Sequence, residues 1–378
     1  MSDWNWQHKA GIGEPPGRAG GVAVERAIGD LRRGGVVLLG DSRGVLLVQA
    51  AEAAISPGAF IALTGEPASC IVPAGRALAL GLETGGGGNM ALRRTSRDGE
   101  EMQAALVRTI AGVDTAATGL PSLSVTPAQG LQNTAVELVK LARLLPVALV
   151  AGVAGDPLAL ARAHNLLSVE AAAVADYRSV VEEGGVTPVA RAPVPLEGAG
   201  DAEIIAFRPA DGGKEHLAIV IGQPDPAKPV LTRIHSECFT GDLLGSLRCD
   251  CGEQLRGAIR AISRDGGGIL LYLAQEGRGI GLVSKLHAYR LQDEGFDTID
   301  ANERLGFDAD ERVYRPAAII LRQLGYKAVR LLTNNPAKVA GLTACGISIV
   351  DRVPHAFPAN GHNEAYLKTK AARAGHLL

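Results

Sequence analysis

The sequence predicts an α/β fold divided into two domains, and three observations support this prediction. Its 378 residues are enough for about two domains of ordinary size. Short apolar runs typical of buried strands alternate with segments whose apolar residues recur at helical spacing, as in α/β folds. No segment combines the glycine fingerprint and acidic partner of a dinucleotide-binding βαβ unit, so we expect mixed sheets rather than doubly wound ones.

In the first half of the chain, residues 22–33 have the apolar spacing of a helix and are followed by two glycines that would end it. The short apolar runs 36–39 and 147–150 predict buried strands. Four consecutive glycines predict a flexible loop over 83–89, and the Pro/Gly-rich residues 1–20 predict a flexible tail. The same alternation continues in three further segments: 58–64, 103–111 and 133–145.

Residues 190–200 contain two prolines followed by small residues, which predicts a linker between domains. We therefore expect a first domain over 21–195 and a second over 196–378. Five apolar runs in the second domain predict strands, at 202–207, 216–221, 230–235, 268–272 and 329–333. Four amphipathic segments predict helices, at 252–264, 282–295, 317–324 and 338–345.

Charge and hydropathy exclude several classes of function. The 38 Lys+Arg and 40 Asp+Glu give a net charge of −2, without the basic surplus of a nucleic-acid binder. No apolar run approaches the ~20 residues that cross a bilayer, and the start lacks the basic and apolar regions of a secretory signal. The odd number of five cysteines is then expected as reduced thiols in the cytoplasm.

Three of the cysteines, Cys238, Cys249 and Cys251, fall within fourteen residues. Thiolates are soft ligands that suit Zn²⁺, and three protein ligands leave one tetrahedral position for a water molecule. The cluster therefore favours a catalytic zinc site. Two alternatives remain: a structural zinc completed by His235, or no metal, with the thiols buried as small apolar side chains.

Two motifs with simpler explanations lie further along the chain. In residues 275–282, three glycines would let backbone N–H groups approach an anion, and Arg278 adds a planar guanidinium. Alone, such a turn is more often an ordinary connection between a strand and a helix. In residues 305–312, Asp310 lies two residues from Arg312 beside a glycine turn, and spacing alone favours a surface ion pair.

Residues 330–338 carry the fourth signal. An apolar strand is expected to end at Thr333, Asn335 can cap a helix, and Pro336 suits the first helical position. A helix N-terminus and Lys338 would then face one spot and bind an anion. An ordinary capped helix explains Asn335 and Pro336 but leaves Thr333 and Lys338 without a role.

In this order, over residues 230–378, the four segments resemble GTP cyclohydrolase II. The resemblance implies hydrolysis of GTP to 2,5-diamino-6-(5-phosphoribosylamino)pyrimidin-4-one, formate and pyrophosphate in riboflavin biosynthesis. Water activated at the metal would attack C8 of guanine. Cys238, Cys249 and Cys251 would hold one Zn²⁺ per subunit, and Mg²⁺ would accompany the GTP phosphates. The resemblance also implies a cytoplasmic homodimer that binds neither nucleic acid nor membrane.

The resemblance assigns roles to individual residues. Asp310 matches the proton acceptor, and Arg312 matches a nucleophile toward the α-phosphate. Because a guanidinium stays protonated, stabilisation of transition-state charge is an equally good role for Arg312. Glu276 suits the guanine N–H donors, and Thr333 and Lys338 match triphosphate contacts. The other matching GTP contacts are Arg233, Ile234, His235, Ser236, Glu237, Gln254, Gly277, Arg278, Tyr289 and Thr298.

Two positions depart from the family pattern. Ala274 stands where many members have arginine, and Ser284 stands where many have asparagine. Neither position belongs to the expected metal ligands. We expect both to tune affinity without abolishing the reaction.

The first domain resembles the dihydroxybutanone phosphate synthase that is often fused ahead of this enzyme, in stretches such as 27–37 and 133–142. That synthase needs several carboxylates for Mg²⁺, whereas residues 40–47 offer only Asp41, and Asn133 replaces the usual histidine. One carboxylate holds a divalent cation weakly, so we expect a degenerate synthase domain. The alternatives are a bifunctional enzyme that still converts ribulose 5-phosphate, and a non-catalytic zinc- and nucleotide-binding sensor.

Overall fold

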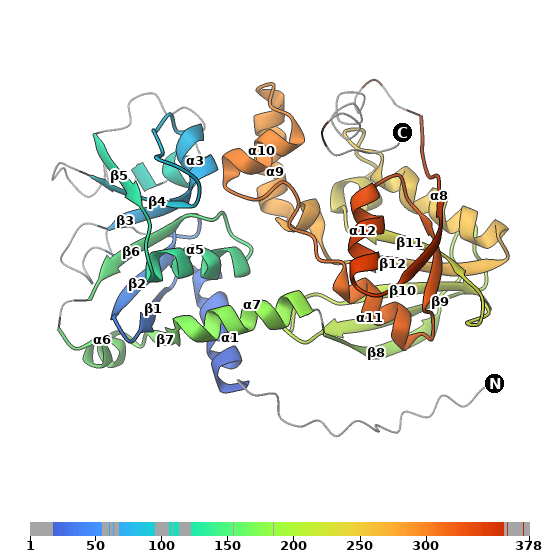
Figure 1. Cartoon of the computed structure of the whole chain (residues 1–378), viewed down its shortest axis with the longest axis horizontal. Coiled ribbons are helices and arrows are strands. Elements are labelled where there is room, and N and C mark those ends of the chain that lie inside the picture. The colour runs from blue at the N-terminus through green and yellow to red at the C-terminus, as the bar shows by residue number, and fades with distance from the viewer. Residues whose placement is uncertain are drawn as a thin grey trace.

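The computed structural model contains two seven-stranded sheets, one in each half of the chain (Figure 1). It describes residues 18–54, 60, 63, 68–94, 106, 107, 109–112, 122–153, 155–183, 185–358, 361 and 373. Most of the predicted tail, and parts of the predicted segments 58–64 and 103–111, lie outside these residues. Within them, no helix is long and apolar enough to span a membrane. All five cysteines are free thiols, as predicted.

The first sheet has the strand order β5-β4-β3-β6-β2-β1-β7. Only β1 and β7 pair in parallel, and the other neighbours are antiparallel, so the sheet is mixed as predicted. Its strands are β1 (Val36–Asp41), β2 (Gly44–Ala50), β3 (Ser69–Pro73), β4 (Asn89–Arg94), β5 (Leu123–Pro127), β6 (Ala148–Gly152) and β7 (Leu167–Glu170).

Both faces of this sheet are buried. Alternate residues of a strand point to opposite faces, and Val37 and Leu39 of β1 belong to one apolar cluster while Leu38 belongs to another. The first cluster is covered by α1 (Arg18–Arg32), α5 (Leu131–Leu141) and α7 (Ala171–Glu183). The second includes residues of α3 (Ala74–Ala79) and α6 (Pro157–His164). Residues 82–88 form a loop, close to the predicted 83–89.

The second sheet has the strand order β14-β13-β11-β12-β10-β9-β8. The strands β14, β13, β11 and β12 are parallel, whereas β10, β9 and β8 continue the sheet antiparallel. The strands are β8 (Val186–Pro193), β9 (Ala202–Pro209), β10 (His216–Gly222), β11 (Val230–Ser236), β12 (Gly267–Leu273), β13 (Ala328–Leu332) and β14 (Ser348–Val353).

The predicted linker, residues 190–200, overlaps β8, which forms the edge of the second sheet. Proline lacks an N–H donor, and an edge strand tolerates this because its outer side needs no partner. The prolines that suggested a linker therefore lie in and beside an edge strand. We propose that the domain boundary lies close to Val186 rather than at residue 195.

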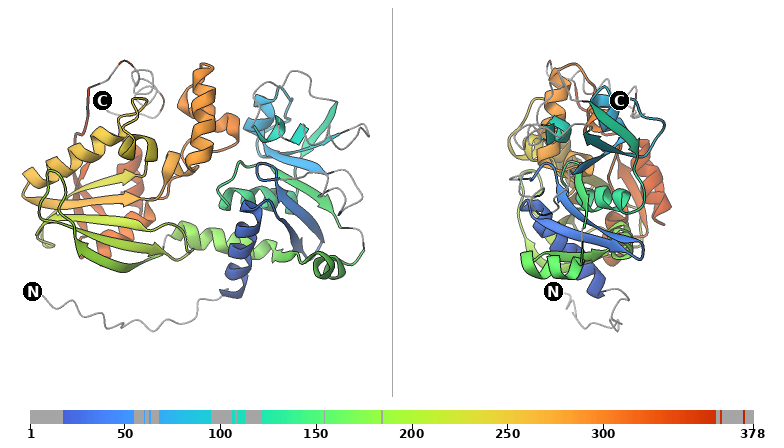
Figure 2. Two further views of the ribbon diagram at one scale, coloured as in Figure 1. Left: turned by 180° about the vertical axis from the view of Figure 1, so that it is seen from behind. Right: turned by 90° about the vertical axis from the view of Figure 1, so that its left-hand side faces the viewer.

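The four helices predicted in the second half are present as α8 (Cys251–Arg264), α9 (Leu282–Asp293), α11 (Arg315–Gln323) and α12 (Pro336–Ala344). The sequence patterns did not predict α10 (Thr298–Leu305), β8, β14, or the short helical turns η1 (Phe239–Leu243) and η2 (Glu276–Gly279). The helices α9 and α10 lie between the two sheets (Figures 1 and 2).

Candidate active site

A cleft opens where the parallel strands β11, β12 and β13 end. Because parallel strands end at the same edge of a sheet, the segments after Ser236, Leu273 and Leu332 converge there. The cleft contains about 1100 Å³ of empty space, part of it open to solvent. Among the described residues, only Glu237 and Glu276 bring carboxylates to its wall, and six cationic side chains line it: Arg233, Arg248, Arg278, Lys285, Arg312 and Lys338.

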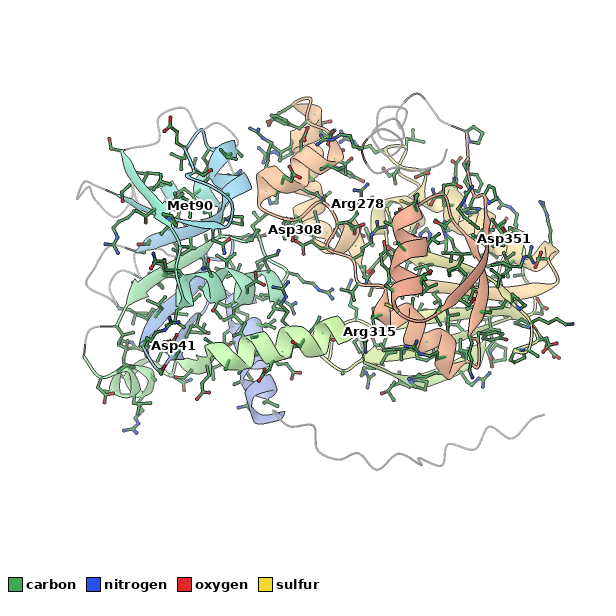
Figure 3. All side chains as sticks on the ribbon, in the orientation of Figure 1. Asp41, Met90, Arg278, Asp308, Arg315 and Asp351 are labelled. Carbon is green, nitrogen blue, oxygen red and sulfur yellow. The ribbon has the colours of Figure 1, made fainter. Side chains whose placement is uncertain are left out.

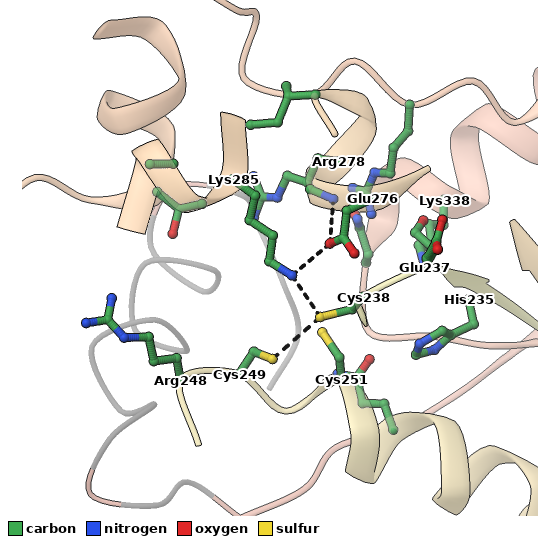
Figure 4. Close-up of a pocket in the computed structure, with 18 of the residues that line it drawn as sticks. His235, Glu237, Cys238, Arg248, Cys249, Cys251, Glu276, Arg278, Lys285 and Lys338 are labelled. Carbon is green, nitrogen blue, oxygen red and sulfur yellow. Dashed lines mark hydrogen bonds and ion pairs between the residues drawn. The ribbon is translucent and has the colours of Figure 1, made fainter. Parts of the chain in front are cut away.

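The thiols of Cys238, Cys249 and Cys251 meet at one wall of the cleft (Figure 4). The Sγ atoms of Cys238 and Cys249 are 3.8 Å apart, and all three sulfurs lie within 4.8 Å of one another. Sulfurs bound to a tetrahedral zinc ion at ~2.3 Å stand about 3.8 Å apart. No other group of three metal-ligating side chains occurs among the described residues. The three cysteines therefore fit a metal site.

Gly241, in η1, packs directly against the three cysteines. A Cβ at this position would lie 2.7 Å from the Sγ of Cys249, 3.0 Å from the Sγ of Cys238 and 2.9 Å from the Cβ of Cys251. The absence of a side chain at residue 241 therefore lets the thiols meet. Nothing in the sequence pattern marked this glycine as part of the site.

Contacts within the thiol cluster shift the pKa values of its cysteines. Hydrogen bonds from Cys249 and Cys251 lower the pKa of Cys238, and the Nζ of Lys285 lies 3.1 Å from its Sγ. The hydrogen bond to Cys238 raises the pKa of Cys249 to about 11. Because a metal binds thiolates, metal binding would release the protons that these thiols still carry.

His235 does not belong to the thiol cluster. Its Nε2 lies 3.0 Å from the Oδ1 of Asp242, whose Oδ2 accepts hydrogen bonds from the Cys238 amide (2.9 Å) and from the Tyr272 hydroxyl (3.0 Å). Burial lowers the pKa of His235, so its ring is neutral. This arrangement does not support the alternative of a structural zinc completed by His235.

Lys285 joins the metal site to Glu276. Its Nζ lies 2.7 Å from the Oε1 of Glu276 and 3.0 Å from the Oγ1 of Thr240. The Glu276 carboxylate also accepts hydrogen bonds from the backbone N–H groups of Phe239 (2.6 Å) and Gly277 (3.1 Å). Since a carboxylate has about four acceptor sites, three internal donors leave Glu276 about one for a ligand.

The glycine-rich segment 275–282 takes the backbone conformation that its glycines allow. Gly277, Gly279 and Gly281 have φ angles of 63°, 100° and 88°. Arg278 also has a φ of 63°, which costs energy for a residue with a Cβ and is typical of functional sites. A Cβ at Gly279 would lie 2.8 Å from the carbonyl oxygen of Glu311. The segment is therefore held tightly against the loop that follows α10.

The segment after β13 forms the predicted capped helix. The Oδ1 of Asn335 accepts a hydrogen bond from the Ala337 N–H (2.9 Å), and Pro336 is the first residue of α12. The Nζ of Lys338 donates to the carbonyl oxygen of Ile234 (2.8 Å). Thr333, Asn335 and Lys338 all line the cleft.

Asp310 and Ile234 do not line the cleft, although both were expected to act at the site. Ile234 is buried in the apolar core beneath the sheet, so only its backbone faces Lys338. Asp310 accepts a hydrogen bond from the Nε of Arg312 at 2.7 Å. Burial raises the pKa of Asp310, but hydrogen bonds and charge from Arg312 lower it overall. Asp310 is thus ionised and reaches the cleft through Arg312.

The cleft brings together the other predicted residues and adds some that the sequence patterns did not reveal. The predicted ones on its wall are Arg233, His235, Ser236, Glu237, Gln254, Glu276, Gly277, Arg278, Tyr289, Thr298, Arg312, Thr333 and Lys338. The added polar ones are Arg248, Lys285, Gln292, Asn302, Asn334 and His355. Of these, Lys285 had the clearest available signal, as a cation in the first turn of the helix after the glycine-rich segment.

Comparison with known proteins agrees with this geometry. The GTP cyclohydrolase II family profile matches residues 187–354. A GTP cyclohydrolase-2 from Azospirillum brasilense is 63% identical over 250 residues, 65% of this chain and 65% of that protein. A GTP cyclohydrolase-2 from Azotobacter vinelandii is 57% identical over 166 residues, 44% of this chain and 80% of that protein.

Two further proteins show some similarity to this chain. A riboflavin biosynthesis protein RibBA from Bacillus cereus is 44% identical over 259 residues, 66% of this chain and 64% of that protein. A solved two-domain 3,4-dihydroxy-2-butanone 4-phosphate synthase from A. baumannii is 18% identical and covers 88% of this chain and 99% of that one. Its TM-score of 0.33 is too low to support a comparison of folds.

The chain belongs to the GTP cyclohydrolase II family. The profile match covers nearly all of the second sheet and every cleft-lining residue except His355, and the Azotobacter vinelandii relative is matched over 80% of its length. The matches to the Azospirillum and Bacillus relatives span 65% and 64% of those proteins.

Proposed function

We propose that this protein is a zinc-dependent GTP cyclohydrolase II that hydrolyses GTP to 2,5-diamino-6-(5-phosphoribosylamino)pyrimidin-4-one, formate and pyrophosphate in riboflavin biosynthesis. The observation that carries the proposal is the pairing, in one cleft, of a three-thiol cluster with six cationic side chains. The thiols fit a soft divalent cation, and the cations suit the negative charge of a triphosphate. Because the chain belongs to the GTP cyclohydrolase II family, we propose GTP as the substrate bound in this cleft.

Cys238, Cys249 and Cys251 would hold the zinc ion. A zinc ion bound by three protein ligands supplies a Lewis acid that lowers the pKa of water toward neutrality. Lys285 holds the Cys238 sulfur and the Glu276 carboxylate in place. We assign the remaining acceptor site of Glu276 to a guanine N–H group, so that Lys285 would fix the base relative to the metal site.

The phosphates would occupy the cationic part of the cleft. Thr333 and Lys338 lie at the N-terminus of α12, where the helix dipole favours an anion. Arg312, oriented by the ionised Asp310, would stabilise negative charge that develops as pyrophosphate leaves. Mg²⁺ would accompany the GTP phosphates, since the described residues offer no cluster of carboxylates to hold it.

The first domain would not retain synthase activity. The Oδ2 of Asp41 accepts hydrogen bonds from the Nε (3.1 Å) and Nη2 (2.8 Å) of Arg43, so a guanidinium occupies the only expected metal ligand. Asn133 is held by Asn89 (3.0 Å) and by the Ala128 carbonyl oxygen (3.2 Å). These contacts favour a degenerate domain over a bifunctional enzyme.

We also propose a cytoplasmic homodimer. Large apolar side chains of two neighbouring segments are exposed beside the cleft: Leu243, Leu244 and Leu247, and Val283 and Leu286 of α9. Contact between Thr240 and Tyr289 joins the two segments. Since exposed apolar clusters mark interfaces, a second copy could bury this surface. Analytical ultracentrifugation of the wild type and of Leu243→Asp tests this, and an unchanged mass for the variant would contradict it.

The activity is tested by incubating zinc-loaded protein with GTP and measuring formate and pyrophosphate separately. We expect both products in equal amounts. Bound zinc and GTP without either product would instead indicate the non-catalytic sensor. Pyrophosphate without formate would show that the phosphates are cleaved without opening of the guanine ring.

A further inference from the structure

The loop that carries Asp310 and Arg312 has no secondary structure of its own and lies next to the first domain. This segment, the 306–314 loop, connects α10 to α11. Figure 3 shows Asp308 of this loop in the space between the two sheets. Because no helix or strand fixes the loop, contacts with surrounding elements must determine where Arg312 lies.

One such contact is an ion pair that crosses between the domains. The Nζ of Lys140, in the last turn of α5, lies 2.9 Å from the Oε1 of Glu311 and 3.5 Å from the Oδ2 of Asp308. The side chains of Lys140 and Glu311 are each only 22% exposed, so solvent screens this pair less than a surface pair. Burial lowers the pKa of Lys140, but the hydrogen bond and charge of Glu311 raise it overall.

Glu311 connects Lys140 to the rest of the loop and to the glycine-rich segment of the cleft. Its Oε1 accepts a hydrogen bond from the Asp308 N–H (2.9 Å), and its own N–H donates to the carbonyl oxygen of Arg278 (3.1 Å). Residue 311 also lies between Asp310 and Arg312 in the chain. The first domain thus contacts a loop residue that is itself bonded to the glycine-rich segment of the cleft, as are Ala309 and Val313 of the same loop.

Apolar packing supports the same interface. Leu145, at the end of the segment after α5, is fully buried in a cluster with Ile280 and Ala288, which line the cleft. Gly306, the first residue of the loop, has a φ of 94°, and a Cβ there would lie 2.9 Å from Pro146 and 3.0 Å from Pro73. The start of the loop is therefore held between two prolines of the first domain.

We propose that the first domain positions the 306–314 loop for catalysis, and that Lys140 is the positioning residue. A degenerate synthase domain would then keep a role in the reaction of the second domain without a substrate of its own. The expected effect on catalysis rests on the proposed function. The restraint on the loop does not, because it is present in the protein without ligand.

The test compares Lys140→Met with Arg178→Met as a matched control. Glu137 lies in α5, one turn before Lys140, and its Oε2 is 2.7 Å from the Nη1 of Arg178 in α7. This ion pair does not involve the loop. Two readouts are measured on the full-length protein: amide hydrogen exchange over 306–314, and kcat and KM for GTP. Zinc content serves as a check that the thiol cluster is intact.

For Lys140→Met we expect exchange over 308–311 to be at least about tenfold faster and kcat to fall about tenfold, since small displacements of catalytic groups are costly. KM should change less than about twofold, and Arg178→Met should resemble the wild type. The charge swap Lys140→Glu with Glu311→Lys should restore part of kcat. A general loss of stability would not produce this rescue.

The possible failures are distinguishable. Unchanged loop exchange in Lys140→Met would overturn the inference, as would faster exchange with an unchanged kcat. If the wild type does not turn over GTP while Lys140→Met still loosens the loop, the proposed function fails and the positioning by Lys140 stands.

Discussion

Gly241→Ala is expected to disrupt the metal site without touching a ligand. The added Cβ would lie 2.7 Å from the Sγ of Cys249, whereas ordinary contact begins at 3.4 Å, so the sulfur must move by about 0.7 Å. Zinc sites tolerate about 0.2 Å in ligand distance. We expect zinc affinity to fall at least tenfold, which corresponds to about 1.4 kcal/mol. Competition with a chromophoric chelator measures this change directly.

The matched control is Gly200→Ala, because residue 200 lies in the same domain and a Cβ there would meet nothing within 4 Å. This variant should bind zinc like the wild type. Thermal unfolding of both proteins without metal separates a local effect from general overpacking, which costs about 1–3 kcal/mol. If Gly241→Ala holds zinc as tightly as the wild type, the three thiols do not share an ion in the arrangement described here.

Three further predictions concern the ligands, the pH dependence and the first domain. Cys249→Ser should abolish formate release and lower the zinc content, and an active variant would show that the thiol is dispensable. Burial lowers the pKa of His216 from 6.5 to about 4, so the unfolded state binds more protons between these values, and the free energy of unfolding should fall as pH drops from about 6.5 to 4. His216→Asn keeps an acceptor for the Ala274 N–H and should reduce this dependence in urea titrations without removing it, because burial also lowers the pKa of His355 to about 4. An unchanged slope would contradict the role of His216. Incubation with ribulose 5-phosphate and Mg²⁺ should yield no dihydroxybutanone phosphate, and its appearance would establish a bifunctional enzyme.

Local patterns predicted most regular elements of the second domain. The strands at 216–221 and 230–235 and the helix at 252–264 were found within one residue of their predicted bounds. The apolar periodicity of these strands and of this helix is visible within a few residues of sequence, so local patterns are enough to predict them. The edge strand β8 was not predicted, because its prolines are locally typical of a linker. Its pairing with β9 depends on residues further along the chain.

The site was predictable where chemistry is concentrated in short motifs. Three cysteines in fourteen residues indicated a metal, and the cap at Asn335 indicated an anion site; both segments line one cleft. Lys285 had only a weak signal, its position in the first turn of the helix after the glycine-rich segment. Gly241 was not predictable, because a glycine is informative only once its neighbours in space are known. The same holds for Lys140, which lies 171 positions before Glu311 in the sequence.

X-ray absorption at the zinc edge of the metal-loaded protein tests the central claim most directly. The account predicts three sulfur neighbours at ~2.3 Å together with at least one lighter atom, and loss of one sulfur in Cys249→Ser. A spectrum with four sulfur neighbours, or with nitrogen and oxygen neighbours alone, would contradict a three-thiolate ion that keeps a position for water.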